Sequence, residues 1–222
     1  MANRKHLLKL GSGVITVAVG EGEKQKEFAV HEALITERSR FFRNAIQGNW
    51  KEAEERIVNL TEDHPDVFEL YLQALYAGHV ELPDGHATDT FYNMLGGVFV
   101  LAERIRDVKT KNLIVEEIKA KADIREHFAA YLQMAAVIYN GTPGPCGIRR
   151  LLVDLVARSN DYHAAQEGIE KFTAKLEGVP KQFLMDLVFG LYTKRQTNSR
   201  SGWNSFKSES AATYMEDEST SQ

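Results

Sequence analysis

The sequence predicts an α+β fold, in which a small sheet is packed by helices and an all-helical region follows. Short runs rich in β-branched residues occur between residues 14 and 60. From residue 65 onward, apolar residues recur every three or four positions, the period of amphipathic helices. With 43% hydrophobic and 26% charged residues, the 222-residue chain has the composition of a globular protein that buries its own core.

Three short strands are expected in the first part of the chain. Residues 14–19 are rich in β-branched side chains, and residues 27–30 alternate between polar and apolar; the two runs flank a polar turn that contains Gly20 and Gly22. This arrangement predicts a β-hairpin. The third strand is expected at residues 56–60.

Residues with helix-boundary preferences delimit the predicted helices. Ser39 is a suitable N-cap for a short helix that ends near Gly48. Pro65 suits the first turn of a helix over residues 65–77, and Gly78 is suited to its C-terminal end. Further helices are expected at residues 91–102, 108–118, 128–136, 151–156, 169–176 and 180–191.

Two adjacent glycines, Gly96 and Gly97, interrupt the apolar pattern of the predicted helix at residues 91–102. Glycine lowers helix propensity by about 1 kcal/mol relative to alanine, so such a pair needs a compensating reason. We therefore expect a neighbouring element to pack closely against this helix.

The composition changes after Tyr192. The last residues are rich in serine and poor in aliphatic side chains, so residues 194–222 are predicted to be a disordered tail. Trp203 and Phe206 are exceptions within it. They are either chance apolar residues of a linker or a short docking motif.

Charge and cysteine content narrow the class of protein. A net charge of −4 argues against a nucleic-acid binder, which needs a clustered basic face. No apolar run reaches the roughly 20 residues of a membrane helix, and the N-terminal apolar stretch is too short for a signal peptide. The single cysteine, Cys146, has no partner for an internal disulfide. These features predict an intracellular protein of the cytoplasm or nucleus with no membrane partner.

The sequence offers little support for catalysis. It contains no phosphate-binding loop and no nucleophile elbow, and Gly11-Ser12-Gly13 precedes a strand instead of following one. None of the seven histidines is paired at the i, i+4 spacing of a metal-binding helix. We therefore assign no catalytic, cofactor-binding or metal-binding residues and expect no cofactor. An enzyme that uses Cys146 is the least favoured hypothesis.

The first half of the chain resembles a BTB/POZ domain. The matching positions, read in order, are the Phe-x-Val-His end of the hairpin, the Ser-x-x-Phe helix, and the helix that ends in Tyr-x-Gly. The residues at these family positions are Phe28, His31, Ser39, Phe42, Tyr76 and Gly78. In the family the histidine belongs to the fold, so the resemblance implies a structural role for His31 and no catalysis.

The second half resembles the helical extension of BTB/POZ proteins of the fungal type. The stretches that carry this resemblance are residues 138–143, 149–153 and 183–187. The resemblance implies a BTB/POZ domain followed by a helical extension, and the composition of the tail adds a disordered segment after them. Their expected bounds are residues 10–122, 123–193 and 194–222.

The resemblance implies a non-catalytic adaptor that binds protein partners. In one branch of the family, members bridge substrates to cullin-type ubiquitin ligases and carry an apolar-x-Glu motif before the third strand. Trp50, Lys51 and Glu52 match that motif and are the predicted partner-binding residues. Alternatively, Trp50 covers a core edge and the charged run at residues 51–56 is a solvated turn.

The alternative function is a homotypic dimerisation module without a ligase role. The family often places an acidic residue just before the first strand, where it contributes to a charged pocket at the dimer interface. In this chain that position is Gly13. The missing carboxylate puts the usual family dimer in doubt.

Overall fold

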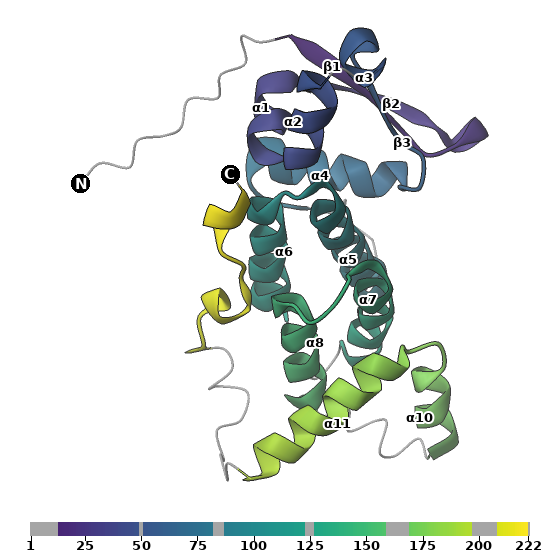
Figure 1. Ribbon diagram of the computed structural model, residues 1–222. Helices are drawn as coiled ribbons and strands as arrows, with labels where there is room; N and C mark the ends of the chain where they lie inside the picture. Colours follow the sequence, from purple (N-terminus) through teal and green to yellow (C-terminus); the bar gives the residue numbers. More distant parts are fainter. Residues whose placement is uncertain are drawn as a thin grey trace.

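The computed structural model describes residues 13–48, 51–81, 87–122, 127–158, 169–196 and 208–221. The molecule is elongated, with the sheet and its short helices at one end (Figure 1). Helices α5 to α8 form the middle, and α10 and α11 form the opposite end (Figure 1). Across the described residues, no helix is long and apolar enough to cross a bilayer.

The sheet has three strands in the order β2-β1-β3. Its strands are β1 (Val14–Val19), β2 (Lys26–His31) and β3 (Ile57–Leu60). Strands β1 and β2 form the predicted antiparallel hairpin, and β3 pairs in parallel with β1. Strand β2 ends beside the start of β1, and β3 begins near the same end on the other side of β1. The chain between them therefore passes from one edge of the sheet to the other. Short helices make this crossover connection.

The crossover contains α1 (Glu32–Arg38), α2 (Arg40–Gln47) and α3 (Lys51–Glu55). Ser39 caps α2 as predicted, because its hydroxyl accepts a hydrogen bond from the main-chain N–H of Phe42 (3.2 Å). The charged run predicted to be a solvated turn instead forms the short helix α3.

Three longer helices follow: α4 (Pro65–Ala77), α5 (Thr88–Ile105) and α6 (Val108–Lys121). Gly78 ends α4 in the left-handed conformation, with φ of 73°. The close packing expected at the glycine pair is confirmed. A Cβ on Gly97 would lie 3.0 Å from Val67, and one on Gly96 would lie 3.2 Å from Met134.

The C-terminal helices are α7 (Phe128–Gly141), α8 (Gly147–Arg158), α10 (Ile169–Leu176) and α11 (Lys181–Gln196). Helix α7 lies along α5, and α8 and α11 pack on α7. The hydrophobic core is one cluster that runs from Ile15 in the sheet to Phe183 in α11. The predicted α+β fold with a helical extension is therefore confirmed, and the core continues past residue 122 without a break.

The predicted disorder of the tail is wrong for residues 208–221. This segment forms two 3₁₀ turns, Ala211–Tyr214 and Glu218–Ser221, that lie against α6 and α8. Tyr214 is buried, and its hydroxyl donates to Asp154 (2.7 Å). Average composition misses such a segment, because one aromatic side chain and matched charges suffice to dock it on a helical surface. Trp203 and Phe206 lie outside the described residues.

Candidate functional site

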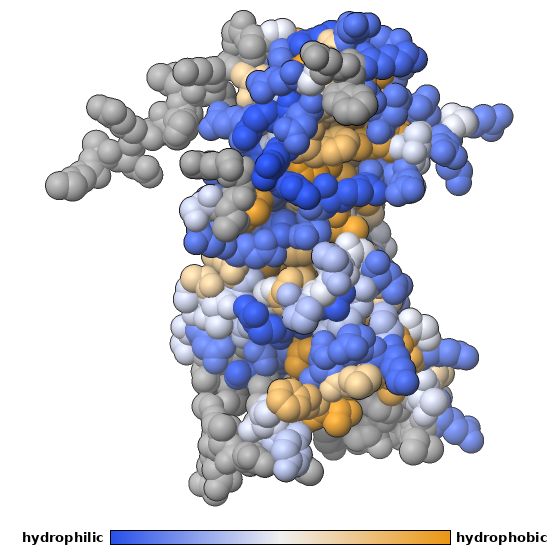
Figure 2. Space-filling view, in the orientation of Figure 1, coloured by the Kyte–Doolittle hydropathy of each residue, from blue (hydrophilic) through white to orange (hydrophobic). Residues whose placement is uncertain are grey.

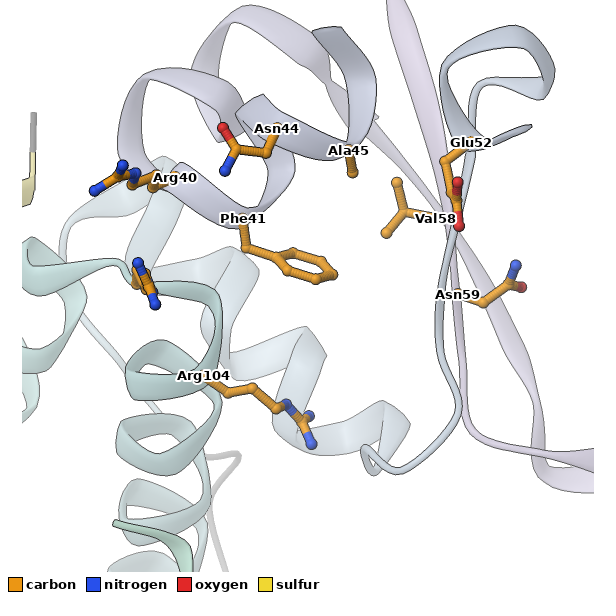
Figure 3. A pocket seen from close by; sticks show the side chains of 9 residues that line it. Arg40, Phe41, Asn44, Ala45, Glu52, Val58, Asn59 and Arg104 are labelled. Carbon is orange, nitrogen blue, oxygen red and sulfur yellow. The ribbon is translucent and has the colours of Figure 1, made fainter. Parts of the chain in front are cut away.

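A groove of about 500 Å³ opens where α2, α3, β3 and the end of α5 meet (Figure 3). Its lining residues are Arg40, Phe41, Asn44, Ala45, Glu52, Val58, Asn59, Arg104 and Arg106.

Helix α2 places an aromatic ring in the groove. The cap at Ser39 sets the rotation of α2, so that Phe42 and Ile46 face the core and are buried. Phe41 is one position out of phase with that face and is 36% exposed. Its ring points into the groove, between α2 and Val58 (Figure 3). A partner side chain that covered this ring would bury apolar surface on both molecules.

Three arginines give the groove a positive rim: Arg40, Arg104 and Arg106. Arg104 is held by ion pairs to Glu62 and Asp63. Within the described residues, no ion-pair partner is found for Arg40 or Arg106. The rim is therefore suited to carboxylates, which arginine binds in a planar, two-pronged geometry.

Arg106 occupies an unusual backbone conformation. It ends α5 with φ of 59°, in the left-handed region that non-glycine residues rarely adopt. The main-chain N–H groups of Arg106 and Asp107 donate to carbonyls of the last turn of α5, which stabilises this turn. From this turn the Arg106 side chain lines the groove together with residues of α2.

A buried network beneath the groove holds that turn in place. Asp107 is fully buried and accepts hydrogen bonds from Arg38 Nε (3.2 Å), the Tyr71 hydroxyl (3.2 Å) and Thr110 (3.0 and 2.8 Å). Burial and the nearby Asp107 carboxylate raise the pKa of Tyr71, so this phenol stays protonated and donates. Beside it, the Ser39 hydroxyl donates to the Ile105 carbonyl (2.6 Å). The network ties α1 and α2 to the α5–α6 turn.

Residues 15–95 match the family model of the BTB/POZ domain, a stretch that contains the sheet, the groove-lining helices α2 and α3, and α4. The N-terminal part of the chain is a BTB/POZ domain. Among curated proteins, the comparison finds no match. The BTB/POZ domain is a protein–protein interaction module of a family that is generally non-enzymatic. The groove therefore lies on an interaction module, with α2, α3 and β3 supplied by the matched residues.

The predicted partner-binding residues of the BTB/POZ domain lie in different environments. Trp50 lies outside the described residues. The Lys51 side chain is 79% exposed and pairs with Glu55 one turn along α3 (3.3 Å). Glu52 lines the groove, across from α2 (Figure 3). Of the described pair, Glu52 therefore belongs to the groove and Lys51 faces solvent.

Two residues at family positions of the BTB/POZ domain, His31 and Tyr76, are hydrogen-bonded to each other. The Tyr76 hydroxyl accepts from the main-chain N–H of His31 (3.0 Å) and lies 2.9 Å from His31 Nδ1. The two rings meet edge to face, with centroids 5.9 Å apart. This pair joins the end of β2 to the end of α4 and gives His31 a role in holding the fold.

The remaining family positions lie in or beside the core. Phe42 is fully buried, and Ser39 caps α2 and bonds to α5. Phe28 packs against Phe68 of α4, with ring centroids 5.0 Å apart. Gly78 ends α4 in the left-handed conformation described above.

Gly13 of the BTB/POZ domain lies beside a carboxylate from another position. The main-chain N–H of Glu32 donates to the Gly13 carbonyl (3.1 Å), and a Cβ on Gly13 would lie 4.0 Å from Glu32 Oε2. Glu32 forms an ion pair with Arg56, which precedes β3. An acidic group paired with an arginine is thus present next to β1, although position 13 itself lacks one.

Sequence reasoning missed the arginines of the groove. Arg104 and Arg106 lie at the end of α5, more than 40 residues after β3, and nothing in their local pattern connects them to α2. Phe41 could have been found, because a large aromatic directly beside the buried Phe42 falls off the apolar face of its helix. That position off the apolar face predicts that Phe41 is more exposed than Phe42.

Cys146 lies just before α8 and packs against the hydrophobic core. It is half-buried, so the thiol contributes apolar contacts there. In the part of the chain that the structure describes, no group of three His, Cys, Asp or Glu side chains is placed to hold a metal ion.

Proposed function

We propose that this protein is an adaptor whose BTB/POZ groove captures an acidic segment of a partner protein, and that the partner is the N-terminal region of a cullin-type ubiquitin ligase. The observation that carries the proposal is that the partly exposed Phe41 ring lines the same groove as Arg40 and Arg106, for which no ion-pair partner is found among the described residues. An apolar anchor flanked by arginine is the usual composition of an interaction hot spot. The position of Glu52 at the groove supports the cullin assignment, because it belongs to the matched motif.

The proposed binding mode combines two kinds of contact. A partner side chain covers Phe41, and partner carboxylates pair with the arginine rim. Because the arginines are partly exposed to solvent, we expect them to raise the association rate and to make binding salt-dependent. We place the adaptor in the cytoplasm or nucleus, since the lone Cys146 suits a reducing compartment.

Reversal of the rim charge tests the groove. We expect the pair Arg40→Glu and Arg106→Glu to weaken binding to a purified cullin N-terminal region at least tenfold, because carboxylates would then face carboxylates. Calorimetry at two salt concentrations measures the affinity. The variant's affinity should also fall less steeply with salt than that of the wild type.

The matched control changes the net charge equally at a distance from the groove. Lys24 and Lys109 are exposed and do not line the groove, so Lys24→Glu with Lys109→Glu should bind like the wild type. Trp50→Ala with Glu52→Ala tests the motif separately. Unchanged cullin binding in both the motif and the rim variants would overturn the proposal.

A further inference from the structure

Helix α11 carries an apolar face that the described chain does not cover. Met185 is 56% exposed, Val188 67%, Phe189 70% and Tyr192 61%. At a spacing of three and four residues, these side chains form one stripe along the helix. Figure 2 shows apolar atoms on the surface at the end of the molecule where Figure 1 places α11. Soluble proteins rarely expose a continuous apolar stripe of this kind without a partner.

The opposite face of α11 is anchored, so the stripe cannot rotate into the core. Phe183 is fully buried, and Asp186 accepts a hydrogen bond from the Tyr139 hydroxyl (2.8 Å). Gly190 lies so close to α8 that a Cβ there would be 2.7 Å from Val153 Cγ1. These contacts on one side fix the rotation of the helix and turn the stripe outward.

The stripe has a two-fold symmetric spacing. Val188 and Phe189 lie on either side of its midpoint, and Met185 and Tyr192 lie equally far from it. If two α11 helices pack antiparallel, each Val188 meets the Phe189 of the second copy. Each Met185 then meets the Tyr192 of the second copy. A surface that is its own complement under a two-fold rotation is the requirement for a symmetric dimer.

We propose that the protein forms an antiparallel homodimer through α11. Four largely exposed apolar side chains supply roughly 400–500 Å² per copy, about half of the approximately 800 Å² that each partner buries in a standard interface. Leu191 flanks the stripe and extends it, with 43% of its surface exposed. Because this area is smaller than that of a standard interface, we expect the dimer to dissociate on dilution.

The proposed dimer interface is separate from the groove. Helix α11 lies at the end of the molecule opposite the sheet, and the groove lies beside the sheet (Figure 1). Dimerisation through α11 would therefore leave both grooves open and give the assembly two binding sites. Such bivalency strengthens the binding of a partner that itself presents two copies of its segment.

Light scattering over a range of concentrations tests the dimer on the full chain. We expect the mass to rise from 25.0 kDa toward twice that value with concentration. The pair Val188→Glu and Phe189→Glu should stay monomeric throughout, with dimer affinity lowered at least 100-fold. Val14→Glu with Gln25→Glu, two exposed positions of the sheet end, should dimerise like the wild type. A wild type that stays monomeric at about 200 μM, or a dimer that only the Val14 variant abolishes, would overturn the proposal.

Cysteine cross-linking tests the antiparallel orientation. In a Cys146→Ser background, Met185→Cys with Tyr192→Cys should give a disulfide-linked dimer on mild oxidation. Met185→Cys alone should not, because the antiparallel pairing separates the two copies of position 185 by roughly 10 Å along the axis, beyond disulfide reach. The reverse result would indicate parallel packing and contradict the proposed dimer. Cullin binding in the Val188 and Phe189 variant reports separately on the groove.

Discussion

Replacing Asp107 by alanine should lower the free energy of unfolding by about 3–5 kcal/mol, the usual cost of breaking a buried ion pair from one side. The Asp107 carboxylate is fully buried and accepts from Arg38, Tyr71 and Thr110. Its removal leaves a largely buried guanidinium and a buried phenol without their acceptor. Urea denaturation followed by circular dichroism measures the loss.

An exposed ion pair provides the control for this prediction. Lys26 and Asp66 lie 3.1 Å apart with both side chains more than half exposed. Lys26→Ala should therefore cost less than about 1 kcal/mol. If Asp107→Ala cost no more than Lys26→Ala, the network would not be what holds the α5–α6 turn. Partner binding at the groove should also weaken in Asp107→Ala, since Arg106 depends on that turn.

Removing the Tyr214 side chain should undock the C-terminal segment and cost about 3 kcal/mol, as for other buried aromatics. Tyr214 is buried against α6 and α8, and its hydroxyl donates to Asp154. Burial and the Asp154 carboxylate raise the pKa of Tyr214, so the phenol remains a donor at neutral pH. Urea unfolding of Tyr214→Ala measures the cost, and hydrogen exchange shows whether residues 208–221 have lost protection.

The segment is held by charge as well as by the ring. The Lys111 ammonium group is buried and pairs with Glu103 and with Glu216 of the segment. Asn112 accepts from the main-chain N–H of Glu216 (2.8 Å) and donates to its carbonyl (2.9 Å). The amide of Glu216 is therefore a sensitive probe, and its exchange should accelerate on undocking.

A substitution at Gly147 tests the docking of residues 208–221 while the Tyr214 ring is kept. A Cβ on Gly147 would overlap the main-chain carbonyl of Tyr214, so Gly147→Ala should release the segment although alanine favours the α8 helix. A Cβ on Gly144 would meet no atom within 4 Å, and Gly144→Ala should leave the segment docked. Unchanged protection of Glu216 in Gly147→Ala would contradict the packing described for this segment.

Local sequence signals were sufficient to predict most of the helices and strands. Ser39, Pro65 and Gly78 act as the cap, first turn and stop that their chemistry predicts. They succeed because each boundary depends on hydrogen bonds within a few residues of itself. The short helices α1 and α3 were missed, since a helix of one or two turns carries too few periodic positions to stand out.

The groove and the docked C-terminus depended on tertiary packing. The α+β class, the BTB/POZ pattern and the out-of-phase Phe41 can all be read from the amino-acid sequence, because they are encoded by residues close together in the chain. The folded chain was needed to bring Arg104 and Arg106 to α2 and to bury Tyr214 between α6 and α8. These contacts join residues that are far apart in the chain, and their proximity follows from how the helices pack on one continuous core.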